Sequence, residues 1–127
     1  MAPRSIRISV GVVETAAELN DTQTAESIWQ ALPIRGNAQT WGDEIYFAIP
    51  ASLTQENPQE IVDVGDLGYW PPGKAFCIFF GATPASKGNE IRPASPVNVF
   101  GKIIGDATVF KKVKAGSEII VERSRDC

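Results

Sequence analysis

The stretch "KAFCIFF" (Lys74–Phe80) decides the fold, because it is apolar on both faces that a strand would present. Side chains alternate along a strand, so the run divides into two sets that face opposite ways: Ala75, Cys77 and Phe79, and Phe76, Ile78 and Phe80. A strand of this kind must be covered on both faces. In a chain this small, we expect the wall of a β-barrel with a helix packed outside it.

An aromatic pair and a stiff turn precede that strand in "GDLGYWPPG" (Gly65–Gly73). The two prolines fix φ and Gly73 can adopt positive φ, so we expect Tyr69 and Trp70 to enter the strand through a rigid turn. Two roles for the pair remain open. It forms the rim of a preorganised binding surface, or Trp70 only fills one end of the barrel.

The rest of the chain indicates short strands and two helices. Asn20–Thr22 supply helix caps before an apolar stripe that carries Trp29 as a core residue, and Pro33 ends this helix. A second, short helix is expected from the cap Asp106 to the C′ position at Gly116. The expected strands lie at 5–10, 12–19, 44–49, 74–80, 97–104 and 117–123, with loops at 51–66 and 81–96.

Composition limits the function classes. The chain has 127 residues, a net charge of −3 and a pI of about 4.9, which predicts a single domain (1–127) with no nucleic-acid or anionic-membrane partner. No apolar run approaches the roughly 20 residues of a membrane span, and the start lacks a signal-peptide pattern. Two cysteines, Cys77 and Cys127, form neither a disulfide framework nor a metal set. We expect a cytoplasmic protein and an inert, buried Cys77 thiol.

Histidine is absent, which excludes Ser-His-Asp and Cys-His catalysis and histidine-bearing zinc sites. A general base would have to be a carboxylate or lysine with a shifted pKa. Asp43 and Glu44 are adjacent acids, but strand neighbours point to opposite faces, so we expect them to be solvated or to cap a turn. We therefore assign no catalytic residue, no metal and no cofactor.

Several motifs resemble those of known families. "QTAESIWQAL" (Gln23–Leu32) and "NVFGKIIGDATVFKKVKAG" (98–116) are similar to segments of the cyclophilins. Nearly the whole chain resembles a family of small, uncharacterised prokaryotic proteins with a cyclophilin-like fold, through "WGDEIYFAIP" (41–50), "VGDLGYWPPGKAFCIFFGATP" (64–84) and "PASPVNVFGKIIGD" (93–106). The resemblance implies a mainly β fold, a closed antiparallel barrel of the eight-stranded type with two helices. It implies no activity.

The chain departs from true cyclophilins at their isomerase groove, which needs an arginine, a methionine, a glutamine and a histidine. Here the only methionine is Met1, and histidine and a Gln-Gly-Gly motif are absent. We therefore favour a non-catalytic binding module for a peptide or small ligand. A weak or divergent prolyl isomerase is the alternative. A carboxylate- or lysine-based enzyme comes third, and it would require a buried acid or lysine in a cleft.

The loop at 81–96 supplies the remaining candidates. Arg92, beside Ser95, could meet an anion or a carbonyl of a ligand, or form a surface ion pair. If the loop folds back along the barrel, it would meet the "GYWPPG" turn and wall a groove. A homo-oligomer is left open. The candidate ligand-binding residues are Tyr46, Tyr69, Trp70, Thr83, Arg92 and Ser95.

Overall fold

The computed structural model describes residues 4–124, and its nine strands form one β-sheet. Met1 and Cys127 therefore lie outside the described residues. Among these residues there are also one α-helix, α1 (Gln23–Ala31), and two 3-10 helices, η1 (Pro71–Gly73) and η2 (Ala107–Lys112). The strands are β1 (Arg4–Val10), β2 (Val13–Leu19), β3 (Ile34–Asn37), β4 (Gln39–Thr40), β5 (Glu44–Ala48), β6 (Asp66–Trp70), β7 (Ala75–Phe79), β8 (Asn98–Ile104) and β9 (Glu118–Arg123).

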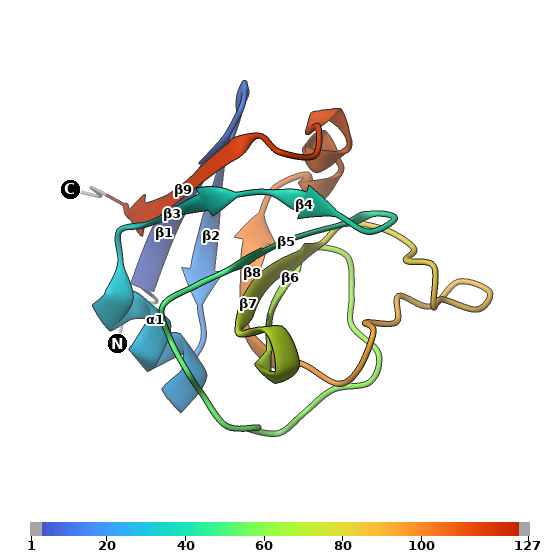
Figure 1. Cartoon of the computed structure of the whole chain (residues 1–127), viewed down its shortest axis with the longest axis horizontal. Helices are drawn as coiled ribbons and strands as arrows, with labels where there is room; N and C mark the ends of the chain where they lie inside the picture. Colours follow the sequence, from blue (N-terminus) through green and yellow to red (C-terminus); the bar gives the residue numbers. More distant parts are fainter. Residues whose placement is uncertain (1–3, 125–127) are drawn as a thin grey trace.

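The sheet curls into a nearly closed barrel. Its strand order is β3-β9-β1-β2-β8-β6-β7-β5-β4, and the strand pairs are antiparallel. The two end strands, β3 and β4, are consecutive pieces of one segment separated by Ala38, as Figure 1 shows. This segment pairs with β9 through its first part and with β5 through its second. The predicted mainly β, antiparallel barrel with two helices is confirmed.

Both predicted helices form, and they lie on different sides of the barrel (Figure 1). Helix α1 begins after Thr22, whose side chain accepts a hydrogen bond from the backbone of Ala25. The second helix, η2, begins after Asp106 but ends at Lys112. The prediction of Gly116 as its C′ residue is wrong, because Gly116 lies in the turn before β9 with φ of 92°.

Strand β7 is buried along its whole length, which confirms the covering of both faces predicted from "KAFCIFF". Its inner side chains join the barrel core, where the ring of Phe76 packs between Phe47 and Phe100. Its outer side chains, Ala75, Cys77 and Phe79, join a second apolar cluster. The loops contribute Val62, Ile91 and Val97 to this cluster.

The outer cover of β7 differs from the prediction of a helix. Two extended loop pieces cover this face, and they pair with each other through antiparallel bridges at Gln59–Val97 and Val62–Ile91. The bridges satisfy backbone hydrogen bonds while Val and Ile side chains cover the strand, so no helix is needed there. Within residues 4–124, no helix is long and apolar enough to cross a membrane.

Candidate ligand-binding pocket

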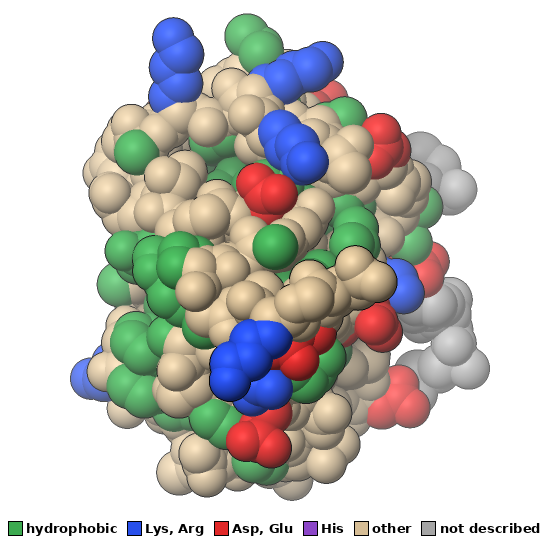
Figure 2. Space-filling view, turned by 90° about the vertical axis from the view of Figure 1, so that its right-hand side faces the viewer, with side chains coloured by type: hydrophobic (Ala, Val, Ile, Leu, Met, Phe, Trp, Pro, Cys, Tyr) green, Lys and Arg blue, Asp and Glu red, His purple; other side chains and the backbone are tan. Residues whose placement is uncertain are grey.

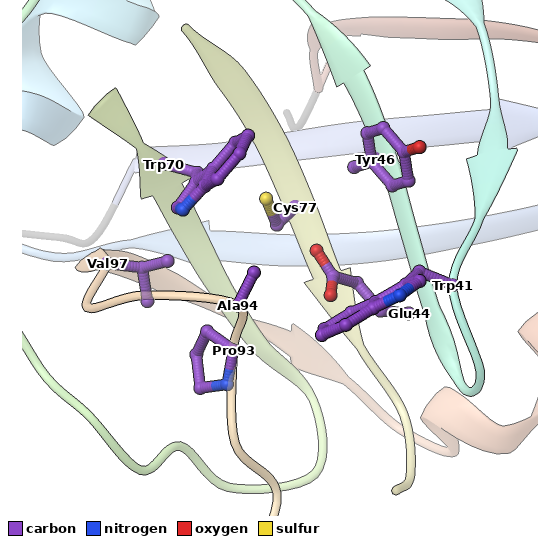
Figure 3. A pocket seen from close by; sticks show the side chains of 8 residues that line it. All are labelled: Trp41, Glu44, Tyr46, Trp70, Cys77, Pro93, Ala94 and Val97. Carbon is purple, nitrogen blue, oxygen red and sulfur yellow. The ribbon is translucent and has the colours of Figure 1, made fainter. Parts of the chain in front are cut away.

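A pocket of about 250 Å³ lies on the outer face of the barrel wall formed by β5, β7 and β6. Figure 3 shows how the pocket is built: side chains of the strands form its floor, and the loop before β8 forms one wall. Figure 2, which looks onto the side of the molecule carrying the 81–96 loop, shows hydrophobic side chains gathered on one part of that face. The lining residues are Trp41, Glu44, Tyr46, Trp70, Cys77, Pro93, Ala94 and Val97.

Strand register brings the floor residues together. Strand β5 pairs Glu44 with Phe79 and Tyr46 with Cys77, so Glu44, Tyr46 and Cys77 share the outer face of the sheet. On the other side of β7, Trp70 of β6 pairs with Ala75. Its side chain therefore points to the same face, and Figure 3 shows the indole across Cys77 from Tyr46.

The loop wall of the pocket is fixed to the barrel by specific hydrogen bonds. The indole Nε1 of Trp70 donates to Ser95 Oγ over 2.6 Å. Val97 makes two backbone hydrogen bonds with Gln59, at 2.8 and 3.1 Å. Pro93 and Ala94 are thereby held over the floor, so the pocket does not need to be assembled by a ligand.

A tight turn between β4 and β5 positions Trp41 at the remaining edge. The backbone N of Trp41 donates to Glu44 O over 2.9 Å, and that of Asp43 donates to Ala82 O over 2.8 Å. Gly42 has φ of 61°, and a Cβ there would lie 2.9 Å from Ala82 O. The turn is therefore packed directly against the start of the 81–96 loop, with no room for a side chain at position 42.

Glu44 is the unusual residue of the pocket. It is only 6% exposed, and burial raises the pKa of its carboxyl to about 7, because the charged form loses its hydration. The neighbouring Cys77 thiol acts in the opposite direction on the Glu44 pKa but does not offset the burial. The pocket thus holds a carboxyl that changes charge near neutral pH.

The thiol beside Glu44 is held protonated. Burial raises the pKa of Cys77 well above its ordinary value, and the neighbouring Glu44 charge raises it further. Of the residues that line the pocket, none is a lysine or an arginine. The site therefore offers aromatic surface and one carboxyl group, without a basic group.

Three of the predicted candidates lie at the pocket. Tyr46 and Trp70 line it, and Ser95 supports it through the hydrogen bond to Trp70. Trp70 is partly buried, as the binding-rim interpretation expects, but it lies on strand β6 rather than on a turn. The predicted turn is confined to η1, which follows the aromatic pair.

Tyr69 points away from the pocket because it is the strand neighbour of Trp70. Its side chain is fully buried in the barrel core. Its hydroxyl donates to Ala51 O over 2.7 Å and accepts from Leu53 N at 3.1 Å. Through these two hydrogen bonds, Tyr69 anchors the loop after β5 to the barrel core.

Thr83 and Arg92 also lie outside the lining. The Thr83 hydroxyl donates to the carbonyl of Arg92 and accepts from Ala85 N, so it organises the loop internally. The Arg92 guanidinium forms an ion pair with Glu90, at 2.7 Å between Nε and Oε2. Of the two interpretations of Arg92, the surface ion pair is the one observed.

Sequence reasoning missed Glu44 and Trp41. It placed Glu44 on the opposite strand face from Asp43, but treated the acid as solvated or capping, whereas it is buried. The available signal was an acid two residues before an aromatic on the face opposite the core residues. Glu44 also meets the requirement stated for the third hypothesis, a buried acid in a cleft.

Comparisons with known proteins place this site in context. A family model described as "Cyclophilin-like" matches residues 4–122. The solution structure of the hypothetical protein AF2241 from Archaeoglobus fulgidus is similar, with 41% identity, a TM-score of 0.81, and coverage of 96% of this chain and 95% of that one. No curated protein matches.

A more distant similarity is the structure of McbB in complex with tryptophan. It shares 15% identity and a TM-score of 0.73 with this chain. The match covers 96% of this chain but 45% of McbB, so the chain spans less than half of that protein. At this identity the likeness shows a common fold.

Proposed function

The chain belongs to the cyclophilin-like family, and from that premise we propose that it is a binding module for a small molecule, held in the pocket on the outer face of the barrel. The observation that carries this proposal is the preformed pocket with the Glu44 carboxyl buried in it. Burying a carboxyl costs stability. A carboxyl that stays buried in a cleft despite this cost is a candidate for a functional residue.

The size of the pocket favours a small molecule over an extended peptide. Ligand pockets commonly measure about 300–1,000 Å³, and this one, at about 250 Å³, is slightly smaller. A single ring with a short substituent would fit it, whereas a peptide could insert only one side chain. McbB, a protein of the same fold, has been observed in complex with tryptophan, which supports small-ligand binding by such barrels.

The surroundings of Glu44 favour binding over catalysis. A carboxyl with a pKa near neutrality could serve as a general acid or base. Its neighbour Cys77 is held as a thiol by the raised pKa, so it is not an activated nucleophile. The aromatic and loop walls contribute contact surface, which suits a module that retains its ligand unchanged.

The test is a fragment screen by two-dimensional NMR on labelled protein, with a variant that fills the pocket. Ala94 is exposed and lines the pocket, so Ala94→Phe should occupy the cavity with little effect on folding. Ala115→Phe is the matched control, because Ala115 is exposed and not among the lining residues. We expect hits that shift signals of Tyr46 and Trp70 and that vanish in Ala94→Phe alone. Hits that persist in Ala94→Phe would contradict the pocket assignment.

A further inference from the structure

The pocket surrounds one carboxyl with aromatic side chains, and this arrangement identifies a class of ligand. We propose that the pocket recognises a small organic ammonium ion, whose positive nitrogen meets the Glu44 carboxylate between Trp41, Tyr46 and Trp70. The inference rests on the proposed function of the same pocket and specifies its ligand chemistry.

The first argument is the missing counter-charge. None of the ion pairs found among residues 4–124 involves Glu44. Glu44 as a residue is only 6% exposed, and no basic residue lines the pocket. A buried carboxylate is costly unless it is paired with a positive group. A cationic ligand would supply that group, whereas an anionic ligand would add a second buried negative charge.

The second argument is the aromatic surround. Figure 3 shows the Trp41 ring next to the Glu44 carboxyl, with Tyr46 and Trp70 on the far side of the same cavity. Aromatic rings attract cations through their quadrupoles. Tryptophan is the most effective of the aromatic residues in this role, and this pocket has two. Neutral apolar ligands would gain contact area from the rings but would leave the carboxyl without a partner.

A metal ion does not explain the site equally well. Within the described part of the chain, no group of three or more metal-binding side chains comes together. Glu44 has the Cys77 thiol beside it, and the pKa of that thiol is raised rather than lowered. A metal ligand would need the thiolate. The aromatic walls add no metal-binding atoms, so an organic cation fits the lining better.

The test uses three ligands that share a phenyl ring and a two-carbon linker but differ in charge: phenethylammonium, 2-phenylethanol and 3-phenylpropanoate. Each is titrated into the protein at pH 8, where Glu44 is mainly ionised, and signals of Tyr46 and Trp70 are followed by NMR. We expect the ammonium to bind about tenfold or more tightly than the alcohol, as one buried ion pair with cation–π support can provide. The carboxylate should bind most weakly.

Two variants separate charge recognition from general effects. Glu44→Gln keeps the side-chain size and removes the charge, and it should reduce the preference for the ammonium to about twofold or less. Glu118→Gln is the matched control, because Glu118 is exposed and pairs with Arg35 on β3. It should retain the full preference.

The outcomes distinguish the two proposals. If the alcohol binds as tightly as the ammonium and Ala94→Phe abolishes both, the small-molecule pocket stands and the ammonium inference is wrong. The same holds if the carboxylate binds best. If none of the three ligands shifts the pocket signals at millimolar concentration, the ammonium inference is wrong, and the fragment screen with Ala94→Phe decides the small-molecule proposal.

Discussion

The indole Nε1 of Trp70 lies 2.6 Å from Ser95 Oγ, and this hydrogen bond joins the barrel wall to the loop that covers it. Trp70 is fixed on β6, whereas Ser95 follows Pro93 and Ala94, the two loop residues over the pocket. The position of the loop wall thus depends on a side-chain contact between segments 25 residues apart.

Ser95→Ala should loosen the loop wall, because it removes the partner of the Trp70 indole. We expect a loss of about 1 kcal/mol in the free energy of unfolding, the usual contribution of such a bond. The backbone amides of residues 94, 95 and 97 should exchange faster with solvent, and any pocket ligand should bind more weakly. Ser52→Ala, at an exposed position in another loop, is the control. Equal exchange rates in the two variants would show that the bond does not hold the loop.

Glu44→Gln should change how stability depends on pH. The pKa of Glu44 is raised from 4.5 to about 7 by folding, so the native state holds the proton more tightly than the unfolded state. Stability contributed by the protonated acid is therefore lost as pH rises from about 4.5 to 7, by about 3 kcal/mol in total. The variant lacks this loss, so it should be the more stable protein at pH 8 and equal or less stable at pH 4. Urea unfolding across this range measures it, and parallel curves would disprove the shift.

Glu56 should show the opposite pH dependence. Its carboxylate accepts hydrogen bonds from the backbone of Gln23 and Thr24, at 3.0 and 2.8 Å, in the first turn of α1. These bonds, with one from the Thr24 hydroxyl, lower the pKa of Glu56. The stabilisation is present above the ordinary pKa of the acid and lost as pH falls through the lowered value.

We therefore expect Glu56→Gln to lower the melting temperature at pH 7 and to have little effect at pH 2–3. Glu60→Gln serves as control, since Glu60 is an exposed acid of the same loop. A melting-temperature difference that is constant with pH would contradict the capping role.

Phe79→Ala should destabilise the barrel by about 3–5 kcal/mol, the range for emptying a packed aromatic site. Phe79 is fully buried in the outer cluster. A Cβ on Gly68 would lie 3.1 Å from its ring, which shows how closely the neighbouring strand approaches. Chemical denaturation measures the loss. A value below about 1 kcal/mol would mean that the loops do not cover β7 effectively.

We expect no prolyl isomerase activity comparable to that of a true cyclophilin. The pocket presents a carboxyl and apolar rings, and no arginine lines it to polarise a prolyl bond. Arg92, which directly precedes the lining residue Pro93 in the sequence, forms an ion pair with Glu90. A protease-coupled assay on a standard proline peptide checks this prediction, and acceleration at the cyclophilin level would refute it.

Local patterns predicted the parts of the fold that depend on local chemistry. The two-sided apolar run identified β7 and the cap at Thr22 identified the start of α1. Strand β6 was mistaken for part of a turn, because Gly68 weakens a strand signal and two prolines follow. The structure shows why position 68 is a glycine. A Cβ there would lie 2.8 Å from the side chain of Val97, a residue of the loop before β8.

The candidate site was less predictable, because it too is formed by residues that are distant in the sequence. Tyr46 and Trp70 stood out as aromatic residues, but the pocket around Glu44 is completed by Pro93 and Ala94, which come about fifty residues later in the chain. Nothing near Glu44 in the sequence indicates that a loop will cover it. Burial, and with it the pKa, is set by contacts that periodicity does not encode.

The place of β9 in the sheet has a consequence for biosynthesis. Strand β9 lies between β1 and β3, so a strand that is made after all the others of residues 4–124 completes the pairing of the first and the third. While the ribosome is still synthesising the segment before Glu118, β1 and β3 each lack this neighbour and present open backbone edges. The barrel can therefore close only after Glu118–Arg123 has been synthesised, and the nascent chain must avoid wrong strand pairing until then.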